Sequence, residues 1–124
     1  MRQGYRQGRV GEEIKKVISE LLLKEIKDPR LDRMISITSV DVSPDLTYAL
    51  IFVTVLTGKE TPKEEREEIE DEVLAGFDSC TGLIRKEIGK KIKLRRVPDL
   101  AFKIDNSMEY GSHMDEMLRE LGLE

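Results

Sequence analysis

The stretch from Tyr48 to Leu56 most constrains the fold, because its nine residues are nearly all apolar. A membrane-spanning helix needs about 20 apolar residues, so this stretch is too short to cross a bilayer. Its β-branched and aromatic content is typical of a strand, and the lack of polar alternation favours a central position in a sheet. We therefore expect a globular domain built around this strand.

A helix is predicted before this strand, over about residues 9 to 27. Apolar residues recur there at spacings of three and four, namely Val10, Ile14, Val17, Ile18, Leu21, Leu22 and Ile26. This spacing places them on one face of a helix. Asp28-Pro29 should end it, since proline cannot continue the helical hydrogen bonds and disfavours the helical conformation of the residue before it.

A second strand is expected between the helix and the central strand. Ile35 and Ile37 alternate with polar residues, and Val40 and Val42 continue the alternation in the opposite phase. A change of phase within one strand indicates a bulge, here near Thr38-Ser39. The turn residues from Ser43 to Asp45 would then join the two strands as a hairpin.

The next segment predicts helix. Thr61 is a candidate N-cap, with Pro62 in the first turn, and apolar residues recur at helical spacing up to Gly89, a plausible C-terminal stop. Because glycine costs a helix about 1 kcal/mol against alanine, we expect two helices separated by a kink at Ser79 to Gly82. One long helix is the alternative.

The last part of the chain predicts a third strand and a final helix. Leu100, Phe102 and Ile104 alternate with more polar residues after Pro98. Asn106-Ser107 can cap a helix that carries Met108, Met114, Met117, Leu118 and Leu121. The expected fold is α+β, with helices on one face of a three-stranded sheet. We divide the chain into a flexible basic arm (1–8), a domain (9–105) and a C-terminal helix and tail (106–124).

Charge is distributed unevenly along the chain. The 21 basic and 25 acidic residues give a net charge of −4, which on its face disfavours an acidic partner. However, Arg85 to Arg96 holds seven basic residues and one acidic residue, whereas Gly58 to Glu72 holds three basic and eight acidic residues. Residues 1–16 hold five basic residues against two acidic ones. A basic run is often only a solvated face, but two basic segments separated by an acidic one favour nucleic-acid binding.

Single residues offer little catalytic chemistry. Cys80 is the only cysteine, which excludes an internal disulfide and a multi-cysteine zinc site and fits a reducing compartment. His113 is the only histidine and no partner motif accompanies it. Four aspartates around the hairpin match no calcium loop, so ordinary turn chemistry is the better interpretation: Asp28, Asp32, Asp41 and Asp45. Nothing predicts a cofactor, a metal or a small-molecule substrate.

Two further features have alternative interpretations. Tyr48 and Phe52 share one side of their strand; stacking on bases is possible, but core packing is the default. The motif from Gly8 to Gly11 is a Gly-x-x-Gly, yet it precedes the first helix, so we interpret it as coincidence.

Five segments, taken in order, resemble the bacterial ribosome-binding factor A family. They are Lys27-Asp28-Pro29-Arg30-Leu31, Ser43-Pro44-Asp45-Leu46, Gly82-Leu83-Ile84-Arg85, Leu94-Arg95-Arg96-Val97-Pro98-Asp99-Leu100 and Asp105-Asn106-Ser107. The resemblance covers about residues 5 to 121. It implies a type II KH-like fold with an Ala-x-Gly interhelical kink, matched here by Cys80, Thr81 and Gly82, where cysteine replaces the usual alanine.

The resemblance also implies a function. Such proteins are non-enzymatic, cytoplasmic assembly factors that bind the free small ribosomal subunit and its 16S rRNA late in maturation, and in many bacteria they are linked to growth in the cold. We expect a monomer with no membrane contact. The candidate phosphate-binding residues are Arg85, Lys86, Lys90, Lys91, Lys93, Arg95 and Arg96, with Arg2, Arg6 and Arg9 adding contacts.

Three other functions remain open. The acidic segment or the methionine-bearing last helix could engage a partner protein on ribosomal particles. The chain could be a KH-type module for single-stranded RNA with no role in the ribosome. An enzyme built from the aspartates near the hairpin is the weakest alternative, because no catalytic constellation accompanies them.

Overall fold

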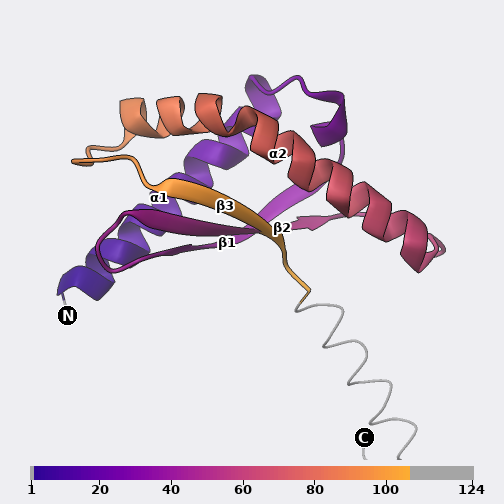
Figure 1. Ribbon diagram of the computed structural model, residues 1–124, viewed down its shortest axis with the longest axis horizontal. Coiled ribbons are helices and arrows are strands. Elements are labelled where there is room, and N and C mark those ends of the chain that lie inside the picture. Colours follow the sequence, from indigo (N-terminus) through magenta and orange to yellow (C-terminus); the bar gives the residue numbers. More distant parts are fainter. Residues whose placement is uncertain (1, 107–124) are drawn as a thin grey trace, which may run out of the picture.

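The computed structural model describes residues 2–106 and the side chains from Gln7 onward (Figure 1). Its elements are α1 (Arg2–Lys24), a 3-10 turn η1 (Pro29–Leu31), β1 (Ile35–Val42), β2 (Tyr48–Val55), α2 (Lys63–Lys91) and β3 (Asp99–Ile104). The expected α+β class is therefore confirmed. Apart from Asn106, the residues of the predicted last helix, like His113, lie outside the described residues. The boundary drawn at residue 106 therefore stays a prediction.

The sheet has the order β1-β2-β3, so the apolar stretch forms the central strand as far as Val55, and Leu56 lies just beyond it. β1 and β2 pair antiparallel as a hairpin, and β3 pairs with β2 in parallel, which makes the sheet mixed. The register shifts between Ile37 and Ser39, which confirms the predicted bulge. The turn is held by Asp45, whose carboxylate accepts hydrogen bonds from Ser43 and Thr47.

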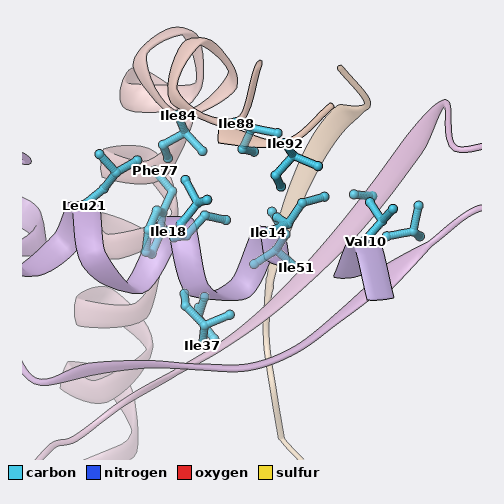
Figure 2. Packing of buried hydrophobic residues seen from close by; sticks show 14 of the residues in the cluster. Val10, Ile14, Ile18, Leu21, Ile37, Ile51, Phe77, Ile84, Ile88 and Ile92 are labelled. Atoms are coloured by element: carbon cyan, nitrogen blue, oxygen red, sulfur yellow. The ribbon is translucent and has the colours of Figure 1, made fainter. Parts of the chain in front are cut away.

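One face of the sheet carries the hydrophobic core (Figure 2). Ala49, Ile51 and Val53 of β2 have no exposed surface. Above them, α1 contributes Ile14 and Ile18, and α2 contributes Phe77, Ile84 and Ile88, so that both helices share a single core. The expected arrangement of helices on one face follows from this alternation along the central strand.

The prediction that Tyr48 and Phe52 pack in the core is wrong. Because neighbouring residues of a strand point to opposite faces, Tyr48, Leu50 and Phe52 lie on the face away from the core. Tyr48 is 46% exposed and the other two are partly exposed. In the described part of the chain neither helix packs on this side.

The helix boundaries differ from the predicted ones. α1 begins at Arg2 and not at the predicted residue 9, so residues 2–8 belong to this helix. It ends at Lys24, before the predicted end at residue 27.

α2 is one helix of 29 residues, not the two expected, and Gly89 lies inside it. Thr61 does not cap it; Pro62 occupies that position without a side-chain cap. Burial explains the continuity, since Phe77, Ile84 and Ile88 have no exposed surface and their burial outweighs the glycine cost.

Candidate nucleic-acid interface

The basic run predicted from the sequence forms one end of the molecule. α2 ends at Lys91, and residues 92–98 form a loop that leads into β3 (Figure 1, left side). The exposed cations here, which we call the cationic end, are Lys86, Lys90, Lys91, Lys93, Arg95 and Arg96. Those in the last helical turn also interact favourably with the partial negative charge of a helix C-terminus.

Half of these cations already have an acidic neighbour. Lys90 Nζ lies 3.4 Å from Glu87 Oε2, and Lys91 Nζ lies 3.7 Å from Glu20 Oε2 of α1. Arg96 Nη2 lies 3.7 Å from Asp99 Oδ2. Within residues 2–106 the structure gives no ion pair to the remaining three, Lys86, Lys93 and Arg95. These three cations therefore have no acidic neighbour among the described residues.

Arg85 has a different role from its basic neighbours. Its Nε donates to the carbonyl oxygen of Pro98 at 3.1 Å, and its Nη2 donates to that of Val97 at 2.9 Å. The same Nη2 lies 3.6 Å from Asp99 Oδ1. Arg85 therefore ties α2 to the start of β3 and fixes the path of the loop. Sequence reasoning grouped it with the phosphate ligands and missed Asp99, which lies near both Arg85 and Arg96.

The N-terminal cations lie on α1. Arg9 is exposed, with its Nε 3.9 Å from Glu13 Oε1. Arg2 and Arg6 belong to the same helix, whose N-terminus and the loop 92–98 lie at the same end of the view in Figure 1. The two basic segments of the sequence thus come from different elements at one end of the fold.

α2 is one continuous helix through Cys80, Thr81 and Gly82. Its ribbon changes direction about midway along its length (Figure 1). Thr81 Oγ1 donates to the carbonyl oxygen of Phe77 at 3.1 Å, a type of bond that competes with the helical ladder and bends helices. Cys80 is half-buried, and this burial raises the pKa of its thiol, as expected for a packing residue. Gly82 is exposed with open space around it.

Replacing Gly82 with alanine should therefore stabilise the protein. A Cβ at Gly82 would meet nothing within 4 Å, and alanine is the better helix former by about 1 kcal/mol. The midpoint of urea unfolding should rise, while the hydrogen bond from Thr81 Oγ1 to Phe77 remains. Gly11→Ala is the matched control, because its Cβ would lie 2.8 Å from the carbonyl oxygen of Val40 and should lower stability. A lower urea midpoint for Gly82→Ala would contradict this account.

The segment Lys27 to Leu31, the first of the five that resemble the family, contacts the middle of α2. Asp28 accepts from the Arg30 backbone N–H at 2.9 Å and pairs with Arg30 Nη2 at 2.6 Å. Arg30 Nη2 also donates to Ser79 Oγ at 3.0 Å on α2. Beside it, Leu31 packs so close to Gly76 that a Cβ there would lie 3.0 Å from Leu31 Cγ. This segment is therefore structural, and Asp28 within it, like Asp45 in the hairpin turn, holds local backbone and side-chain groups by hydrogen bonds.

The Asp28 carboxylate should respond to pH in a defined way. Hydrogen bonds from the Arg30 side chain, and next from the Arg30 backbone N–H, lower the pKa of Asp28 from 3.8 to about 2. A carboxyl whose pKa is lowered on folding stabilises the fold above its ordinary pKa, and this contribution is lost as pH falls toward about 2. Arg30→Ala should raise the Asp28 pKa toward 3.8, with the backbone N–H still lowering it. Carboxyl-carbon NMR titration measures this.

The control is Asp45, whose pKa is lowered by hydrogen bonds from Thr47 and Ser43 instead. Its titration should be the same in the Arg30→Ala variant. An unchanged Asp28 midpoint in that variant would show that the contact with Arg30 does not set its pKa.

The described residues hold no group of three or more histidine, cysteine or acidic side chains that could bind a metal. No helix in this part of the chain is both long and apolar enough to span a bilayer. A three-stranded mixed sheet, two helices and a cationic end thus define a small α+β domain that presents clustered positive charge.

Comparison with known proteins identifies the chain further. The profile of the family described as "Ribosome-binding factor A" matches residues 6–118. A ribosome-binding factor A of Clostridium botulinum (strain Okra) is 45% identical over 117 residues, covering 94% of this chain and 91% of that protein. One from Caldanaerobacter subterraneus is also 45% identical, covering 94% and 89%. The chain belongs to the ribosome-binding factor A family.

Solved structures agree with this assignment. The solution structure of a putative ribosome-binding factor A from Thermotoga maritima is 30% identical, with a TM-score of 0.65 over 85% of this chain and 92% of that one. A Thermus thermophilus structure, at 16% identity and TM-score 0.65, covers 82% and 97% and shares the fold. Coordinates of a Thermus thermophilus factor fitted into a map of a 30S complex share it too, at 16% identity and TM-score 0.57 over 77% and 91%.

Proposed function

We propose that this protein is a non-enzymatic, cytoplasmic maturation factor that binds the free small ribosomal subunit through its 16S rRNA. Membership of the family supports the role. The observation that carries the proposed mode of binding is the cationic end, where Lys86, Lys93 and Arg95 are exposed without an ion pair to any described residue. Clustered lysine and arginine are what phosphate backbones require.

The proposed mechanism is electrostatic docking. The three unpaired cations take phosphates first, and Lys90, Lys91 and Arg96 can exchange their weak surface ion pairs for phosphate contacts. Arg9, with Arg2 and Arg6, adds contacts from α1. Binding one conformer of the maturing RNA better than others shifts its folding equilibrium, and this step requires no cofactor.

We propose further that the domain is of the type II KH-like kind, with Cys80, Thr81 and Gly82 of α2 at the position where such domains have the interhelical kink. A Gly-x-x-Gly loop that clamps single-stranded RNA is not found there, because α2 is continuous through these residues. The only such motif in the described chain, Gly8 to Gly11, lies inside α1, where Gly11 permits close approach to Val40. This favours docking on structured RNA over the alternative of a single-strand clamp.

Sedimentation tests the proposal. The full chain should travel with free small subunits and much less with assembled ribosomes, and rising salt should release it, because phosphate contacts release counterions. Binding that survives RNase treatment of the particles would favour the protein-interaction alternative. Equal binding to free and assembled subunits would contradict the maturation role. A strain lacking the protein should show its growth defect most strongly in the cold.

A further inference from the structure

The two edges of the sheet differ in what covers them. β1 lies under α1, where Gln7 Nε2 donates to the carbonyl oxygen of Val42 at 2.6 Å and Gly11 approaches the carbonyl oxygen of Val40. β3 forms the other edge, and within residues 2–106 no strand pairs with its outer side. An uncovered edge strand is a template for pairing with another chain.

The backbone of β3 shows which groups are available. Asp99 N donates to Thr47 O and Asp105 N donates to Val53 O, so the odd-numbered residues direct their backbone groups toward β2. Along a parallel strand this direction alternates from residue to residue. The N–H and C=O groups of Leu100, Phe102 and Ile104 therefore point outward, with no strand beside them in the described chain.

A groove of about 380 Å³ lies beside this edge, between β3 and the N-terminal half of α2; we call it the β3 groove. Leu74, Phe102 and Ile104 provide apolar surface in it, and Glu67, Glu70 and Asp71 line its α2 side. Lys103 is the one basic residue among the lining side chains. The acidic segment that sequence analysis singled out thus lines a groove next to an open strand edge.

We propose that the β3 groove binds an extended, basic segment of another protein, which adds to β3 as a fourth strand. Main-chain hydrogen bonds to an open edge supply affinity in this mode, and alternate side chains enter the adjacent groove. The acidic lining selects a cationic segment and repels a phosphate backbone, so this surface is distinct from the cationic end. The inference does not depend on the RNA-binding role.

A short peptide of alternating valine and lysine, titrated into the full chain, tests this inference. NMR should show slower amide exchange at Leu100, Phe102 and Ile104 on binding. The same peptide with alternate amides N-methylated cannot donate along one edge and should not bind.

A double variant, Glu67→Gln with Asp71→Asn, should weaken peptide binding roughly tenfold, since it removes two charge contacts. Glu65→Gln with Glu68→Gln is the matched control, because both residues are exposed on α2 and neither lines the groove. It should change affinity much less, and neither double variant should alter binding to the small subunit. Three results would overturn the proposal. The two double variants could lose peptide affinity equally, or the peptide could fail to bind at all. A single-stranded oligoribonucleotide could also slow the exchange of the same amides.

Discussion

Phe77→Ala is expected to lower the free energy of unfolding by about 3 to 5 kcal/mol, the largest effect of any single change considered. Phe77 has no exposed surface, and its ring stacks on that of Phe102 with centroids 4.5 Å apart and planes 8° apart. The substitution would leave a cavity where α2 meets β3. Because total stability is of order 5 to 15 kcal/mol, the variant should be marginally folded at best. The measurement is the midpoint of urea unfolding, with the slope unchanged.

Leu23→Ala is the control for this loss of stability, since Leu23 is 84% exposed and its truncation should change stability by less than about 0.5 kcal/mol. If Phe77→Ala proved as mild as Leu23→Ala, α2 would not be packed on the sheet as described.

The second large effect concerns RNA binding. Changing Lys86, Lys93 and Arg95 together to alanine should reduce the magnitude of the salt slope, d log K/d log[salt], by about 2 to 3, since each lost phosphate contact removes about 0.7 to 0.9. Affinity for the free small subunit at moderate salt should fall by roughly one to two orders of magnitude. Titration of labelled protein with subunits at several salt concentrations measures both quantities.

The control removes the same charge elsewhere: Lys24, Lys27 and Lys59 are exposed and lie outside the cationic end. Their replacement by alanine should leave the slope nearly unchanged, since only contacting charges release counterions. Arg85→Ala provides a second comparison, because it removes the bonds to Val97 and Pro98 and should lower stability as well. If both triple variants behaved alike, net charge and not the cationic end would govern binding.

Local patterns made much of the fold predictable. The central strand, the bulge near Ser39 and the turn at Asp45 each follow from a few neighbouring residues. The continuity of α2 could not be predicted in this way, because glycine propensity is local whereas the burial of Phe77 and Ile88 depends on α1 and β3. Tyr48 and Phe52 were misplaced because near-continuous apolarity does not reveal whether the second face of a strand is covered.

In the candidate site, too, local sequence predicts some features, whereas others depend on contacts between distant parts of the chain. The run from Arg85 to Arg96 is visible as charge, yet the sequence does not reveal which cations are already paired. Lys91 meets Glu20 from a distant helix, and Arg85 uses backbone carbonyls that only the folded loop presents. The same holds for the β3 groove. The sequence shows the acidic segment that lines it, but it does not show that β3 is an edge strand, because this depends on the strand order of the sheet.

Photo-crosslinking most directly tests the central claim, that the cationic end contacts the RNA of the small subunit. A photoreactive side chain placed at Lys93 or at Arg95 should crosslink to 16S rRNA in the complex with the free subunit. The same group at Glu68, on the acidic half of α2, should give little RNA crosslinking. RNA crosslinks that formed from Glu68 and not from Lys93 or Arg95 would contradict the account.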